Sequence, residues 1–109
     1  MSEAAEIGYS AAGIQEIKYD CLAYLKEFGA MPGGWVIALT DRPDIEIGKA
    51  GLRHGSRPWM SRGAISARAA RSVADFLCAR FTDSVQLAGE AQSGRFIVLF
   101  QGRAEQHGG

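Results

Sequence analysis

The sequence predicts an α+β domain with the element order α-β-β-α-β-β, folded as a two-layer sandwich. Two stretches carry apolar residues at helical spacing, and each is followed by two short β-rich runs separated by turn residues. Paired runs of this kind form hairpins, so we expect a four-stranded antiparallel sheet with both helices on one face. The length of 109 residues predicts a single domain over 1–109, with 1–8 and 102–109 flexible.

The first helix is expected to begin after Ser10, whose hydroxyl can accept a hydrogen bond from a first-turn amide. Gly29 can adopt the left-handed conformation that ends a helix, and Pro32 blocks its continuation. Between them, apolar residues recur at intervals of three and four and define one buried face: Ile14, Ile17, Cys21, Leu22, Leu25 and Phe28.

The first hairpin is predicted from residues 35–40, a β-rich run that is apolar on both faces. Residues 41–44 contain Asp and Pro, which favour a turn. Residues 45–49 then alternate apolar and polar side chains, which predicts a second strand, and 51–58 form a polar loop.

The second half repeats this organisation, with Ser61 as the expected cap of the second helix. Its main apolar face comprises Ile65, Ala69, Val73, Phe76, Leu77 and Phe81, and a stripe of small residues comprises Ala67, Ala70, Ala74 and Cys78. Strands follow at 85–88 and 95–100, with a turn at 90–94. The doubly apolar runs 35–40 and 95–100 belong in the middle of the sheet, and 45–49 and 84–88 at its edges.

Two helices on one face leave the other face of this sheet open. Val36 and Ala38 would meet water there, with either Ile97 and Leu99 or the alternative set Phe96, Val98 and Phe100. Each large aliphatic side chain left in water forgoes about 1.5–3 kcal/mol of burial, and a continuous apolar patch usually marks an interaction site. The alternative is that loop 51–60, with Leu52, Trp59 and Met60, folds over this face.

Charge is distributed unevenly, although 12 basic and 12 acidic residues give zero net charge. A basic surface of Arg53, Arg57, Arg62 and Arg68, next to Lys49 and Arg71, would suit a nucleic-acid backbone or an acidic partner. The alternative, which we favour, is a solvated face whose cations pair with the acidic first helix of the same or a second subunit, or locally, as Arg71 can with Asp75.

Residue types for catalysis are few, and we predict no enzyme, no cofactor and no metal site. His54 and His107 are the only histidines, and the acidic residues are scattered singly. Cys21 and Cys78 are expected to be reduced and buried. The acidic N-terminal residues lack the pattern of a secretory signal, and no run approaches the ~18 apolar residues of a membrane span. We therefore expect a cytoplasmic protein with no membrane partner.

One motif pair resembles the layout of GIY-YIG endonucleases. Gly34-Trp35-Val36 is followed, after nine residues, by Glu46-Ile47-Gly48-Lys49. Val36 and Glu46 stand where that family has its catalytic tyrosines, and only Asp75 is available in place of its metal-binding glutamate. This resemblance implies a degenerate domain without cleavage activity.

In size and in its layout from 10–28 through 95–100, the chain also resembles the QslA-type antiactivators of quorum sensing. The resemblance implies a non-enzymatic homodimer that binds a LuxR-type transcription factor and blocks its dimerisation and DNA binding. The contact surface would then be the first helix, through Tyr19, Tyr24 and Phe28, or the open sheet face, through Val36, Ala38, Ile97 and Leu99. Nucleic-acid binding through the basic segment 49–71 is the alternative function.

Overall fold

The computed structural model describes residues 13–28, 34–52 and 58–102. The predictions for Ser10, Gly29, Pro32 and residues 1–8 and 103–109 lie outside these ranges. Three helices and four strands make up the described chain: α1 (Ile14–Phe28), β1 (Trp35–Thr40), α2 (Pro43–Lys49), β2 (Trp59–Gly63), α3 (Ala67–Arg80), β3 (Val85–Gln92) and β4 (Phe96–Gln101).

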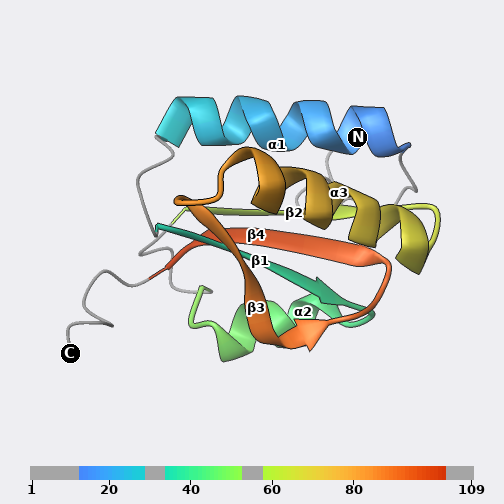
Figure 1. The fold of residues 1–109 in the computed structure, drawn as a ribbon. Coiled ribbons are helices and arrows are strands. Elements are labelled where there is room, and N and C mark those ends of the chain that lie inside the picture. The colour runs from blue at the N-terminus through green and yellow to red at the C-terminus, as the bar shows by residue number, and fades with distance from the viewer. Residues whose placement is uncertain (1–12, 29–33, 53–57, 103–109) are drawn as a thin grey trace, which may run out of the picture.

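The four strands form one mixed sheet with the order β2-β4-β1-β3 (Figure 1). Strand β4 is antiparallel to both of its neighbours, whereas β3 is parallel to β1. The α+β class and the central positions of β1 and β4 are therefore confirmed. The prediction of a purely antiparallel sheet is wrong, because β3 lies beside β1 and parallel to it instead of forming a hairpin with β4.

Residues 45–49 form part of a helix and not the edge strand that we expected. Pro43 occupies the first turn of α2, where its missing N–H costs nothing, and Asp44 and Glu46 lie near the positive N-terminal end of the helix. Ile45 and Ile47, spaced by two residues, suggested strand alternation. On the helix they point to different sides: Ile47 is buried and Ile45 is partly exposed.

Strand β2 arises from residues that we assigned to a loop and a helix cap. Ser61 lies in the middle of this strand, so its predicted role as a cap is wrong. Ser66 caps α3 instead, since its Oγ accepts a hydrogen bond of 3.0 Å from the Ala69 N–H. Ile65 precedes α3 and is 65% exposed, so it does not belong to the buried face of that helix.

The path of the chain explains why helices cover both faces of the sheet. Strands β1, β2 and β3 run in the same direction, because β1 and β2 are both antiparallel to β4. The connection from β1 to β2 crosses the sheet one way, and the connection from β2 to β3 crosses back. Right-handed crossovers then require the two connecting helices to lie on opposite faces. Figure 1 shows α2 on one face and α3, beside α1, on the other.

The sheet therefore separates two cores. The larger core packs α1 and α3 against one face, with members that include Ile17, Leu77, Ile37, Ile97 and Leu99. The smaller core lies under α2 and consists of Ala38, Ile47, Leu52 and Val98.

The predicted open apolar face is thus wrong. Ala38 is only 2% exposed beneath α2, and Ile97 and Leu99 are fully buried because they face α1 and α3. Leu52 covers the second face as the alternative predicted, but Met60 packs into the larger core.

Candidate protein-binding surface

One end of the sheet gathers aromatic side chains that the two cores leave partly uncovered. Strands β1 and β2 begin there and β4 ends there, next to the C-terminal end of α1 (Figure 1). We call this region the aromatic end and define it by five residues: Tyr24, Phe28, Val36, Trp59 and Phe100. All five are partly or largely exposed.

On the α1 side, Tyr24 holds the aromatic end together. Its ring centroid lies 4.7 Å from that of Phe28 and 5.8 Å from that of Trp35, the latter in an edge-to-face arrangement. Its hydroxyl donates a hydrogen bond of 2.9 Å to the carbonyl oxygen of Trp59. Burial raises the pKa of Tyr24 above its ordinary value, so the hydroxyl stays protonated and able to donate. Phe28, at the end of the helix, remains 44% exposed.

On the α2 side, three apolar residues form a row across the sheet. Trp59 is paired with Phe100, and Phe100 is paired with Val36, in the register of β2, β4 and β1. Directly paired residues point to the same face of a sheet, here the face of Ala38 and Val98. Helix α2 covers Ala38 and Val98 but leaves all three members of the row half-buried. This row is what remains of the open face that the sequence predicts.

The predicted partner-binding residues do not lie on one surface. Tyr24, Phe28 and Val36 lie in the aromatic end. Tyr19 is 72% exposed, but it projects from the side of α1 opposite to the buried stripe. Ala38, Ile97 and Leu99 are buried within the chain, as described above. Trp59 was missed, because we assigned it to a loop, and only its size and position before a short apolar pair could have indicated its role.

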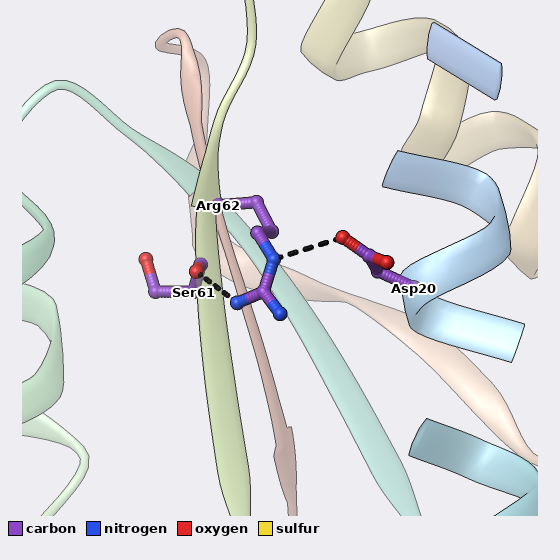
Figure 2. A network of polar contacts seen from close by, with 3 residues as sticks. All are labelled: Asp20, Ser61 and Arg62. Atoms are coloured by element: carbon purple, nitrogen blue, oxygen red, sulfur yellow. Dashed lines mark hydrogen bonds and ion pairs between the residues drawn. The ribbon is translucent and has the colours of Figure 1, made fainter. Parts of the chain in front are cut away.

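Of the predicted basic surface, Arg62 has an acidic partner, and so do the neighbouring cations Lys49 and Arg71. The Nε of Arg62 lies 3.1 Å from Oδ2 of Asp20 on α1, and its Nη1 donates to the Ser61 carbonyl at 2.8 Å (Figure 2). The two cations next to this set also have acidic partners. The Nζ of Lys49 lies 3.6 Å from Oε2 of Glu46, and the Nε of Arg71 lies 3.0 Å from Oδ1 of Asp75. Pairing with the acidic first helix, which we favoured, is therefore confirmed for Arg62.

Two further members of the basic set, Arg53 and Arg57, lie outside the described residues. Arg68 is exposed on the first turn of α3. Of the four described members of this set, Lys49, Arg62 and Arg71 have acidic partners, which lowers the positive charge that the set presents together. We therefore do not propose nucleic-acid binding.

The thiols of this chain are poorly suited to nucleophilic chemistry. Burial raises the pKa of Cys21 from 9.0 to about 12, and burial also raises the pKa of the half-buried Cys78. Within the described part of the chain, no three residues among His, Cys, Asp and Glu are grouped so that they could hold a metal ion. None of the helices described is long and apolar enough to span a membrane.

The layout shared with GIY-YIG endonucleases is not formed. That resemblance needs a strand at each motif. Gly34-Trp35-Val36 leads into the strand β1, but Glu46-Ile47-Gly48-Lys49 lies in the helix α2. Comparisons of the chain with protein-family models, with curated proteins and with solved structures gave no significant match.

Proposed function

We propose that this chain is a non-enzymatic regulatory protein that binds another protein through its aromatic end. The observation that carries the proposal is the row Trp59–Phe100–Val36, which stays half-buried on a face that α2 otherwise covers. Trp and Phe side chains bury large areas and dominate the energetics of protein interfaces. Phe28 extends this apolar surface to the other side of the same sheet end.

The aromatic end is also preorganised, which favours binding. Tyr24 contacts Phe28 and Trp35 and is anchored to the backbone of Trp59, so its rotamer is fixed before any partner arrives. Side chains that are already ordered lose little conformational entropy in a complex.

The finer form of the proposal names the partner as a LuxR-type quorum-sensing transcription factor. Here the chain acts as an antiactivator: as a homodimer, it blocks dimerisation and DNA binding of its target. This partner class rests on the resemblance in size and layout. Adding the chain to a purified LuxR-type factor should weaken operator binding and reduce the dimeric fraction of the factor. If neither changes, the partner class is wrong, whereas binding through the aromatic end stays open to the next test.

The binding surface is tested with substitutions on the two sides of the aromatic end. Phe28→Ser and Phe100→Gln should each weaken binding of the protein partner captured by the wild-type chain roughly tenfold or more. Tyr19→Ser is the matched control, since Tyr19 is an exposed aromatic residue of the same helix on its opposite side. Equal affinity of all three variants, each shown to be folded by circular dichroism, would contradict the proposed surface.

A further inference from the structure

Helix α2 is the one described helix on its face of the sheet, whereas α1 and α3 share the other face (Figure 1). It packs on β4 and β1. Only two of its seven residues, Pro43 and Ile47, are buried. Leu52, just beyond its end, is a third anchor, and Ala38 and Val98 are the sheet residues of the same core. The cover on this face is therefore small and is anchored by three apolar residues.

The helix itself adds little to this anchoring. It has seven residues, whereas an isolated helix needs about 12–15 residues to be even marginally stable in water. Its N-cap residue, Arg42, makes no side-chain capping bond, and Gly48 lowers its helix propensity. At its C-terminal end, the Gly51 N–H donates to the Gly48 carbonyl at 3.1 Å. The Leu52 N–H donates to the Ile47 carbonyl at 3.1 Å, and both of these side chains are buried in the smaller core. Because the same two residues end the helix and dock it, we expect α2 to unfold locally when it leaves the sheet.

The chain that enters α2 is fixed to the sheet by two hydrogen bonds. The Arg95 N–H donates to Oδ1 of Asp41 at 3.2 Å. The Arg42 N–H donates to Oγ1 of Thr40 at 2.9 Å. Both bonds lie before the first residue of α2, so residues 43–52 can detach while the end of β1 keeps its place.

Under α2 lies a second apolar row, next to the row Trp59–Phe100–Val36. In the register of β1 and β4, Val36 is paired with Phe100, and the next pair on the same face is Ala38 with Val98. Trp59 and Phe100 pack against the smaller core, to which Ala38 and Val98 belong. Removal of α2 therefore joins the two rows into one apolar surface.

The same face holds a buried polar group that disfavours the closed form. Ser61 is paired with Val98, so its side chain points to the α2 side of the sheet. Figure 2 shows this side chain on the other side of β2 from Asp20. Ser61 is completely buried, and its hydroxyl has no hydrogen-bond partner among the described residues. An unsatisfied buried hydroxyl costs free energy, and any opening that admits water to this face removes the cost.

We infer that α2 is a lid that opens by local unfolding of residues 43–52, while the sheet and the larger core stay intact. The open form is a minor state that presents Ala38 and Val98 together with the aromatic end. A partner that covers this enlarged surface binds the open form more tightly and shifts the population toward it. The inference rests on the proposed function in naming the aromatic end as the site that the lid regulates, whereas the opening itself does not depend on a partner.

Native-state hydrogen exchange of the wild-type chain measures the opening. The amides of Ala50 and Leu52 donate within the lid segment, and those of Val73 and Leu77 lie in the interior of α3. After correction for intrinsic rates, the lid amides should exchange at least roughly tenfold faster than the α3 amides. Their exchange should also depend less on urea, because opening exposes less surface than global unfolding. Equal protection and equal urea dependence would overturn the inference.

Two substitutions of buried aliphatic residues separate the lid from the larger core. Ile47→Ala removes an anchor of the lid and should accelerate exchange of the lid amides roughly tenfold or more. Val73→Ala is the matched control, since Val73 is fully buried in the larger core. It should accelerate exchange of the α3 amides and leave that of the lid amides unchanged. A Val73→Ala variant in which both sets of amides accelerate equally would show that α2 opens only in global unfolding, and would overturn the lid.

Failure of the lid and failure of the proposed function give different results. The row Trp59–Phe100–Val36 is partly exposed while α2 is closed. If α2 does not open, binding through this row remains testable with Phe28→Ser and Phe100→Gln. If those variants bind the partner as the wild type does, the proposed surface is wrong, while an opening measured by hydrogen exchange stands.

Discussion

Arg62 and Asp20 connect the edge strand β2 to α1 through a partly buried ion pair, with Arg62 Nε 3.1 Å from Asp20 Oδ2. The same guanidinium donates a hydrogen bond to the carbonyl of Ser61. One side chain therefore links α1 to the backbone of β2 at the edge of the sheet (Figure 2). The clustered arginines of the sequence were compatible with ligand binding or with pairing to the acidic first helix, which we favoured. In the structure, this arginine fixes the position of a helix over the sheet.

Asp20→Asn should lower the free energy of unfolding by about 1 kcal/mol, because Arg62 then loses its charge partner while keeping its bond to Ser61. Chemical denaturation at low and high salt measures the effect, and added salt should reduce it. Asp75→Asn removes the exposed partner of Arg71 and serves as the control, with a smaller expected loss. Equal losses for the two variants would contradict a special role for the α1–β2 pair.

Tyr24→Phe should destabilise the chain by about 1 kcal/mol, since the carbonyl of Trp59 loses its hydrogen bond on a protected edge. The ring contacts with Phe28 and Trp35 should persist. Tyr19→Phe removes an exposed hydroxyl from the same helix and should leave the denaturation midpoint unchanged. A Tyr24→Phe variant as stable as the wild type would show that this hydroxyl is not needed to close the edge.

Long periodic segments of this chain could be predicted from the sequence, and short ones could not. Helix α1 repeats its apolar spacing over four turns, which only a helix satisfies. Helix α2 has seven residues, and within it Ile45 and Ile47 match strand alternation as well as one helical turn. The error in α2 also produced the error in topology, because a strand at 45–49 left no helix for the second face.

Strand β2 and its contribution to the candidate site could not be predicted from the sequence for a different reason. Trp59–Gly63 contains Ser, Arg and Gly, which have low strand propensity, and it is a strand because it pairs with the apolar β4. Tyr24, Phe28 and Val36 could be identified as surface candidates from residue type alone. The position of Trp59 beside Phe100 follows from strand pairing, which local sequence patterns do not contain.

Ser61→Ala should be neutral or should stabilise the chain by up to about 1 kcal/mol. The Ser61 hydroxyl is buried with no hydrogen-bond partner among the described residues, and an unsatisfied buried hydroxyl costs free energy. Alanine removes this cost and leaves only a small void. Thermal and urea denaturation measure the change. A loss of stability as large as that of Tyr24→Phe would mean that the hydroxyl makes a bond that the described residues do not supply.

Gly94→Ala should destabilise the chain by roughly 3 kcal/mol or more, through both backbone strain and overlap. Gly94 has a φ of 143°, and a Cβ there would overlap the backbone of Thr40 and Asp41. Gly13→Ala is the matched control, because nothing lies within 4 Å of a Cβ at that position. Urea denaturation of both variants should show a large loss for the first and little change for the second. Similar midpoints would contradict the close approach of the 93–95 turn to the end of β1.

The stability of the chain should decrease as the pH rises above 9, because Cys21 is buried as a neutral thiol. Its pKa is raised from 9.0 to about 12 mainly by burial, with a smaller opposing effect of Arg62 and a smaller supporting effect of Asp20. Below pH 9 the thiol is neutral in both the folded and the unfolded chain. Between pH 9 and pH 12 only the unfolded chain ionises, so the equilibrium shifts toward unfolding.

For one such group, the free energy of unfolding should fall by about 2 kcal/mol between pH 9 and pH 10.5. Urea denaturation across this range measures the slope, and Cys21→Ala provides the control. This variant is less stable at every pH because it leaves a cavity, but its stability should decrease less steeply with pH. Parallel pH profiles for the wild type and Cys21→Ala would show that the thiolate is tolerated in the folded chain, and that the contact between α1 and the sheet admits water.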